Sequence, residues 1–271
     1  MKKILSGERF DLNKYDPTYP KALVNLENPP DVLYGIGNPE AMTEGIAIVG
    51  PRRISDYGRE CAQMFADETA NQGITIISGG ARGCDTIAHQ AALKHNAPTV
   101  AVLGGGCDHV YPSENFNLFQ KIIENNGCVV SEHPFDTEPM PWMFRARNRI
   151  VAAMAKATLV VEAGLPSGTY STVDYALSAG REVLAIPGDI TRPQAQGTNR
   201  IIFEGAMPIT SLEVYREVLY RLSLDQSSKN PEQLMTPIKT SLKEVCEQAK
   251  QASVALNDQS SNQPIKSQEA R

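Results

Sequence analysis

A glycine-rich turn at residues 77–85 is the segment best suited to binding an anion. Its sequence, Ile-Ser-Gly-Gly-Ala-Arg-Gly-Cys-Asp, follows a short apolar run and precedes a helix expected from about Asp85 to His95. Glycines allow close backbone approach, the helix start offers unpaired amides, and Arg82 adds positive charge. We therefore expect phosphate contacts from Ser78, Gly79, Gly80, Ala81, Arg82 and Gly83. The alternative is a tight turn that binds no ligand, and the spacing matches neither the dinucleotide nor the ATP-binding glycine motif.

A second segment, residues 142–150, reads Trp-Met-Phe-Arg-Ala-Arg-Asn-Arg-Ile and combines three arginines with two aromatic rings. Guanidinium groups bind phosphates and rings stack on bases, a combination typical of proteins that bind single-stranded nucleic acid. The candidate contacts are Phe144, Arg145, Arg147, Asn148 and Arg149. The alternative places Trp142 and Phe144 in the core and pairs the arginines with Glu132, Asp136 and Glu138 nearby.

Two further turns follow apolar runs. After residues 46–49 come Gly50, Pro51, Arg52 and Arg53, of which we expect the glycine and both arginines to reach a phosphate, although the proline removes one backbone donor. After residues 158–161, the turn Ser167, Gly168 and Thr169 can offer amides and hydroxyls to a phosphate, and capping of the next helix is an equally good interpretation. For Asp85 and Glu162, capping and hydrogen-bond networks are preferred to catalytic roles.

Composition limits the possible partners and compartments. The 271 residues include 26 Lys and Arg against 31 Asp and Glu, so any polyanion must bind a local basic patch. Five scattered cysteines without C-x-x-C spacing suit a reducing compartment and buried positions, and the histidines lack metal-ligand spacing. No apolar segment reaches the roughly 18 residues of a membrane helix, and no secretory leader is visible. We expect a cytoplasmic protein with no membrane, metal or cofactor association.

Short apolar runs alternate with helix-length segments between residues 46 and 210. The runs are too short for helices and rich in β-branched residues, and they lie at 46–49, 74–77, 99–103, 128–130, 158–161 and 183–186. Helices are expected between them at 57–71, 85–95, 115–125 and 169–179. This pattern predicts an α/β fold, an extended Rossmann-like doubly wound domain whose mostly parallel sheet has helices on both faces. Ligands of such sheets bind beyond the carboxyl ends of the strands, so the turns described above should line one surface.

The remaining segments flank this domain of residues 46–210. Residues 1–45 are rich in turn formers and are expected to form an irregular arm packed on the core. Residues 211–256 are expected to form a helical extension, with helices at 211–222 and 238–256 joined by a polar linker. Residues 257–271 have almost no apolar side chains and are expected to be disordered.

From about residue 15 to residue 210 the chain resembles the DprA/Smf family of DNA-processing proteins of natural transformation. The resemblance rests on ordered segments that include VGPR at 49–52, SGGARGCD at 78–85, AVLGGG at 101–106 with Tyr111 and Pro112, SEHP at 131–134, FRARNRI at 144–150 and SGT at 167–169. The sequence departs from the usual family pattern at Pro51, Cys84 and Arg145.

The resemblance implies a non-enzymatic protein without cofactors. It implies a homodimer that binds single-stranded DNA without sequence preference and helps to load the RecA recombinase in recombination of incoming DNA. The DNA pocket of the family carries over to Arg52, the turn at 78–83, and the segment with Phe144, Arg147, Asn148 and Arg149.

The alternative is a nucleotide-binding enzyme of a related Rossmann family, similar to nucleoside-monophosphate phosphoribohydrolases. Those families have P-G-G-x-G-T-x-x-E where this chain reads LPSGTYST at 165–172. Thr172 stands in place of the glutamate, so the electrostatic stabiliser expected for a cationic transition state is missing from the motif.

Overall fold

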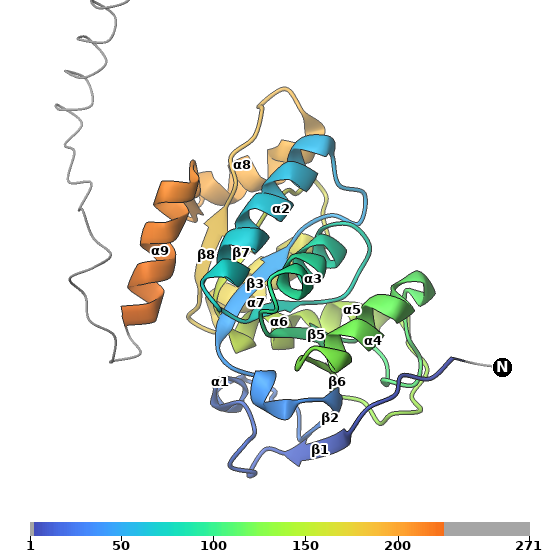
Figure 1. Ribbon diagram of the computed structural model, residues 1–271. Coiled ribbons are helices and arrows are strands. Elements are labelled where there is room, and N and C mark those ends of the chain that lie inside the picture. The colour runs from blue at the N-terminus through green and yellow to red at the C-terminus, as the bar shows by residue number, and fades with distance from the viewer. Residues whose placement is uncertain (1–2, 225–271) are drawn as a thin grey trace, which may run out of the picture. The chain divides into compact units, whose positions relative to one another are not determined.

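The computed structural model describes residues 3–224, which form a single sheet with helices packed against it (Figure 1). The strands are β1 (Arg9–Asn13), β2 (Val32–Gly37), β3 (Gly45–Val49), β4 (Ile76–Ser78), β5 (Thr99–Val102), β6 (Cys128–Ser131), β7 (Ala155–Val160), β8 (Glu182–Ala185) and β9 (Met207–Pro208). The α-helices are α1 (Lys21–Val24), α2 (Asp56–Asn71), α3 (Cys84–Lys94), α4 (Phe116–Glu124), α5 (Pro141–Ala146), α6 (Asn148–Met154), α7 (Thr169–Ser178), α8 (Gln196–Phe203) and α9 (Leu212–Leu224).

All six apolar runs predicted as strands form strands, β3 to β8, and they pair in parallel. A hydrophobic core lies on each face of the sheet, and successive side chains of a strand point alternately into the two cores, as the two-residue repeat of a strand requires. Ile46 and Ile48 pack with α2, α3 and α9, whereas Ala47 and Val49 pack with α6 and α7. In Figure 1, α2 and α3 lie in front of the strands. The extended Rossmann-like fold is confirmed.

The strand order creates a switch point beside β3. In the described residues the order is β1-β2-β6-β5-β4-β3-β7-β8-β9, so the chain moves outward from β3 through β4, β5 and β6 and then returns to β7 on the other side of β3. Loops that leave β3 and β7 therefore diverge to opposite faces. The crevice between them, at the carboxyl ends of the strands, is where doubly wound sheets bind ligands.

The expectation of an irregular arm over residues 1–45 is wrong in part. Residues 9–13 and 32–37 form β1 and β2, which extend the sheet antiparallel beyond β6. The segment that forms β2 contains Gly35 and Gly37 and lies between proline-rich stretches, so its sequence predicts a strand only weakly. In the structure the ring of Phe10 on β1 lies across Gly35, where a side chain would not fit. Leu12, Leu23 and Leu33 of this segment are buried in the core.

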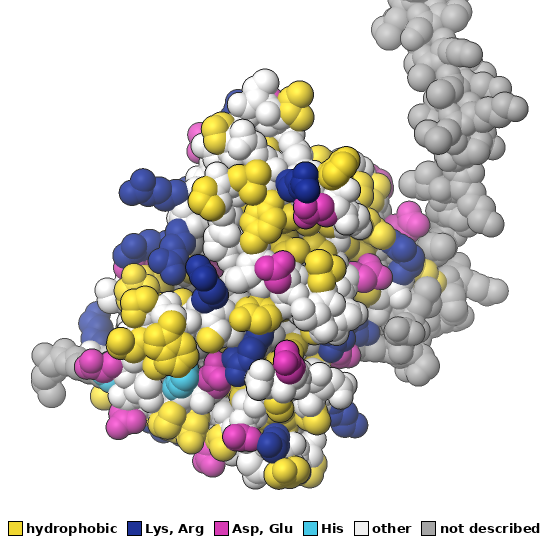
Figure 2. Space-filling model, turned by 180° about the vertical axis from the view of Figure 1, so that it is seen from behind, with side chains coloured by type: hydrophobic (Ala, Val, Ile, Leu, Met, Phe, Trp, Pro, Cys, Tyr) yellow, Lys and Arg dark blue, Asp and Glu magenta, His cyan; other side chains and the backbone are white. Residues whose placement is uncertain are grey.

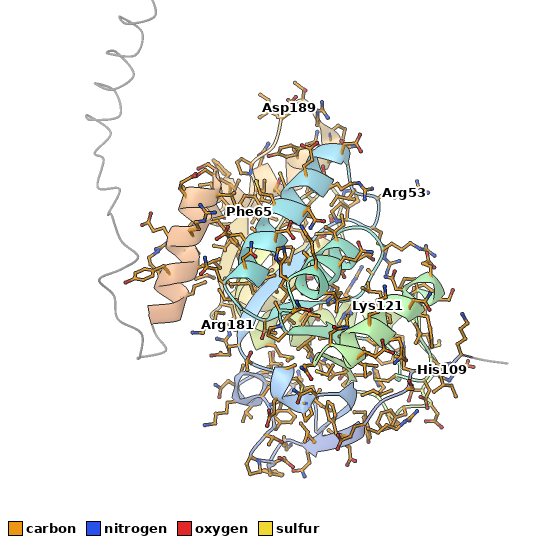
Figure 3. All side chains as sticks on the ribbon, viewed as in Figure 1. Arg53, Phe65, His109, Lys121, Arg181 and Asp189 are labelled. Carbon is orange, nitrogen blue, oxygen red and sulfur yellow. The ribbon has the colours of Figure 1, made fainter. Side chains whose placement is uncertain are left out.

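Helix α9 confirms the helix expected at 211–222 and packs on α2. The hydroxyl groups of Tyr215 and Thr69 lie 2.7 Å apart, and the Tyr215 ring meets Phe65, labelled in Figure 3, edge to face at 5.0 Å. Arg216 adds an ion pair with Glu68 at 2.8 Å. This helix is therefore part of the core, and the predictions for residues 225–271 lie outside the described residues.

The cysteines of the described residues are buried, as predicted: Cys61, Cys84, Cys107 and Cys128 carry free thiols. Burial raises the pKa of the Cys107 thiol to about 12. Across residues 3–224 we find no cluster of histidine, cysteine and carboxylate side chains suited to a metal ion. The helices of that part are too short or too polar to span a bilayer.

Candidate nucleic-acid interface

The turns after β3 and β4 are pressed together at the carboxyl edge of the sheet. Gly83 has a φ of +76°, and a Cβ there would lie 2.7 Å from the carbonyl oxygen of Arg52. The Cys84 amide donates to the Pro51 carbonyl at 3.3 Å, and Gly50 packs directly against the Cys84 side chain. Glycine at positions 50 and 83 therefore brings Arg52 beside the glycine-rich turn.

The polar groups of that turn face inward. Ser78 is buried and donates from Oγ to the Ile48 carbonyl at 2.7 Å, while the Gly80 carbonyl accepts from Asn115 Nδ2 at 2.9 Å. The Ala81 amide donates to Asp85 Oδ2 at 3.1 Å. The anion that the turn holds is thus a carboxylate of the chain itself, which leaves fewer amides for a bound phosphate than the sequence suggested. Asp85 has the network role expected for it.

Arg147 lies beneath the turn and not on the surface. Only 6% of it is exposed, and its Nη1 donates to the carbonyl oxygens of Gly79, at 2.5 Å, and of Val102. Burial lowers the pKa of Arg147 to about 10, against the opposing attraction of Asp85, so it remains charged at neutral pH. Burial likewise raises the pKa of the Asp85 carboxyl, partly offset by Arg147. Arg147, which the sequence predicted to contact DNA, therefore supports the glycine-rich turn from inside the protein.

The neighbouring Asn148 and Arg149 are also engaged within the protein. Arg149 is paired through both of its terminal nitrogens with Glu132, at 2.7 and 2.6 Å, and this pairing raises the pKa of Arg149. Asn148 donates from Nδ2 to Ser171 Oγ at 2.9 Å, which ties α6 to α7. The ion-pair alternative considered for this segment therefore holds for Arg149.

Arg82, in the glycine-rich turn, is exposed but paired. Its Nε contacts Glu114 Oε1, and its Nη2 donates to Glu114 Oε2 at 3.0 Å. The pKa of Arg82 is raised and that of Glu114 lowered by this contact. A phosphate has to compete with Glu114 for this guanidinium.

Three predicted arginines remain unpaired. Arg52, Arg53 and Arg145 are exposed and form no ion pair with any residue that the structure describes. Arg53 extends away from the protein at the right of Figure 3. Figure 2, seen from behind, shows Lys and Arg side chains gathered next to hydrophobic ones at the left of the protein. Of the arginines predicted to contact DNA, Arg52, Arg53 and Arg145 are therefore the ones available to a phosphate backbone.

Beside Arg52 lies a pair of aromatic rings, which we call the Phe144–Tyr111 platform. Phe144 rests on Gly104, whose lack of a side chain lets the ring sit against the turn after β5. The Arg52 guanidinium carbon lies 5.9 Å from the centroid of the Phe144 ring. The centroids of the Tyr111 and Phe144 rings are 5.1 Å apart, and the two ring planes are inclined by 55°. Tyr111 is 43% exposed. Sequence reasoning did not select Tyr111 as a contact, although an aromatic residue soon after the glycine turn at 104–106 was a usable signal.

The turn at Ser167, Gly168 and Thr169 lies after β7, across β3 from the glycine-rich turn. Ser167 Oγ accepts from the Thr169 amide at 3.2 Å, Gly168 is exposed and Thr169 is buried. The Ser167 hydroxyl is therefore engaged in a local turn with the first amide of α7, while the N-cap residue Gly168 provides no side-chain cap.

Glu162, which was weighed for catalysis, and Thr172, which stands in place of the enzymatic glutamate, both follow β7 in the chain. Glu162 accepts from the Ser55 amide at 3.0 Å and from Ser55 Oγ at 2.6 Å, so it anchors the start of α2. Thr172, at the position where the enzyme motif has glutamate, is buried in α7.

The site as a whole, with Arg52, Arg53 and Arg145 exposed and the Phe144–Tyr111 platform beside Arg52, offers the chemistry of phosphate binding and base stacking.

Known proteins with a similar sequence and fold identify the family of this chain. Residues 12–219 match the family described as DNA recombination-mediator protein A. The chain is 40% identical over 202 residues to Protein Smf of Escherichia coli, covering 74% of this chain and 54% of that protein. It spans about half to two thirds of the length of the curated relatives it matches.

Two solved structures are also similar. DprA of Streptococcus pneumoniae matches with a TM-score of 0.72 and 33% identity over 82% of this chain and 76% of that one. DprA of Helicobacter pylori, described for its single-stranded DNA binding mode, matches with a TM-score of 0.71 and 30% identity over 79% of this chain and 97% of that one. The resemblance found in the sequence is confirmed: the chain belongs to the DprA/Smf family of recombination-mediator proteins.

Proposed function

We propose that this chain binds single-stranded DNA without sequence preference. The observation that carries the proposal is the unpaired Arg52 against the Phe144–Tyr111 platform at the carboxyl edge of the sheet. Arg53 and Arg145 supply further unpaired charge near the same edge. The description of the Helicobacter pylori DprA structure, a relative with the same fold, supports a single-stranded DNA ligand.

The chemistry of the platform favours single strands over duplex. Ring faces stack on bases only when the bases are unpaired, at about 1–3 kcal/mol per base. Every base has such a face, so stacking carries little sequence preference. The net charge of −5 makes the local group of arginines, and not the protein as a whole, responsible for attracting the strand.

The proposal extends to recombination. The chain would act in the cytoplasm as a homodimer that delivers the bound strand to RecA, in keeping with the family description as a recombination mediator. RecA loading is measured as ATP hydrolysis by RecA on DNA coated with single-strand-binding protein, with and without this chain. Acceleration that depends on Arg52 supports loading, whereas an unchanged rate despite tight DNA binding argues against it.

We propose no catalytic activity. Glu162 is held by Ser55, Asp85 lies inside the turn, and Thr172 occupies the position of the enzymatic glutamate. Incubation with AMP should release no free adenine; measurable release would favour the phosphoribohydrolase-like alternative.

Fluorescence anisotropy of a labelled oligo-dT tests the proposal. Titration across salt should show affinity falling with a log–log slope of about −0.7 per phosphate contact. Unlabelled single strand should compete well and duplex poorly. Absence of binding at low salt, or equal competition by duplex, would refute single-strand binding.

A further inference from the structure

Trp142 is an exposed ring that the Phe144–Tyr111 platform does not include. It is the only tryptophan in the sequence and stands at the second position of α5 with 59% of its surface exposed. Its ring meets His133 edge to face, with centroids 6.0 Å apart and an interplanar angle of 89°. A flat partner that covered this ring would bury a large apolar area, which is favourable.

Trp142 and Phe144 lie on different sides of the same short helix. Two positions along an α-helix correspond to a rotation of about 200°, and a helix with side chains is about 10–12 Å across. Phe144 accordingly meets Tyr111 and Arg52, whereas Trp142 meets His133 in the loop after β6. One base cannot contact both rings, so the two positions serve different nucleotides of a strand.

An unpaired cation stands between the two rings. Arg145 follows Phe144 on α5, is exposed, and forms no ion pair within the described residues. Two other exposed rings that lie beside a cation, Tyr15 and Phe203, differ in this respect. Tyr15 has Lys14 beside it and Phe203 has Arg200, but Lys14 is paired with Asp31 at 2.7 Å and Arg200 with Glu204 at 2.6 Å.

From this juxtaposition we infer that Trp142 is a second base-stacking position, which extends the DNA site from the sheet edge over α5. The inference rests on the proposed function. The occupant is a base and not an apolar protein surface, because Arg145, three positions after Trp142 on α5, is an unpaired cation that a phosphate of the same strand can contact. Asp136 and Glu138 are exposed in the loop before α5 and repel phosphates, so Trp142 acts through its ring face alone.

The fluorescence of Trp142 reports on the inference directly, since no other tryptophan contributes to the emission of the full-length chain. Saturating oligo-dT should quench it, because a stacked base contacts the indole. Trp142→Ala should weaken oligo-dT binding roughly 5- to 150-fold, the range for loss of one base–aromatic stack. Its salt slope should stay that of the wild type, because no phosphate contact is removed. Trp142→Phe should keep most of the affinity.

Tyr15→Ala is the matched control, because Tyr15 is an aromatic residue with 85% exposure beside a cation that is already paired. It should bind as the wild type does, and circular dichroism should show all variants folded. The anisotropy of labelled oligo-dT with the wild-type protein distinguishes failure of the inference about Trp142 from failure of the proposed DNA binding. Unchanged emission and an unchanged affinity of Trp142→Ala, with wild-type binding intact, would overturn the inference and leave the proposed function standing.

Two other outcomes would also overturn the inference about Trp142. Emission that changes only when RecA is added would identify a protein occupant and overturn the inference. Absence of any oligo-dT binding by the wild type would remove both the inference and the proposed function.

Discussion

Arg147 supports Gly79 from below, with its Nη1 donating to the Gly79 carbonyl at 2.5 Å. The two residues are tightly matched: a Cβ at Gly79 would lie 2.6 Å from the guanidinium carbon. The arginine that local sequence places in a DNA-binding motif thus fixes the shape of the glycine-rich turn. Gly79 must lack a side chain because the guanidinium occupies the space.

Arg147→Met should destabilise the fold. The substitution leaves the Gly79 and Val102 carbonyls without their donor and Asp85 without a nearby positive charge, a loss of about 3–5 kcal/mol in the free energy of unfolding. Urea denaturation measures it. Arg145→Met, two positions earlier and exposed, should stay within about 0.5 kcal/mol of the wild type. Equal stability of the two variants would contradict a supporting role for Arg147.

Replacing the unpaired arginines should act on binding and not on stability. Each of Arg52→Ala, Arg53→Ala and Arg145→Ala removes one available phosphate contact, so each salt slope should become shallower by about 0.7. Anisotropy across salt measures the slope. Arg192→Ala, whose arginine faces Asp189 at 3.7 Å, serves as the comparison. Slopes that remain at the wild-type value would place the phosphates elsewhere.

The sequence predicted the strands better than the state of each arginine. Apolar runs define a buried parallel sheet by themselves, and a strand followed by glycines defines its binding edge. Arg147 is buried with its guanidinium group against Gly79, a residue 68 positions away, and local spacing in the sequence cannot reveal this contact. Pairing of Arg149 with Glu132 and of Arg82 with Glu114 depends on the fold in the same way. The weak strand signal of residues 32–37 has a related cause, since that segment forms a strand by pairing with β1 and with β6, which is distant in the sequence.

Glu114→Gln should strengthen DNA binding. The carboxylate of Glu114 pairs with Arg82, and its removal frees that guanidinium for a phosphate. The salt slope should become steeper by about 0.7 and affinity at low salt should rise. Arg82→Ala in the wild-type background should then change the slope little. A fall in affinity for Glu114→Gln would show that the pair itself is needed to shape the site.

Acidification should loosen the contact between α2 and α9. Arg216 holds the pKa of Glu68 below its ordinary value of 4.5. Because the folded pKa is the lower one, the stabilisation is present above the ordinary carboxyl range and is lost as pH falls. Glu68→Gln should lower the thermal midpoint at neutral pH, and the difference from the wild type should shrink below about pH 4.5. A difference that is constant with pH would exclude this contribution.

Photo-cross-linking of bound oligo-dT, followed by mass spectrometry of the peptides, tests whether bases stack on the Phe144–Tyr111 platform. Thymine cross-links should appear in the peptides that contain Tyr111 and Phe144 and should disappear at high salt. Cross-links confined to other parts of the chain, with none in these two peptides, would contradict this stacking.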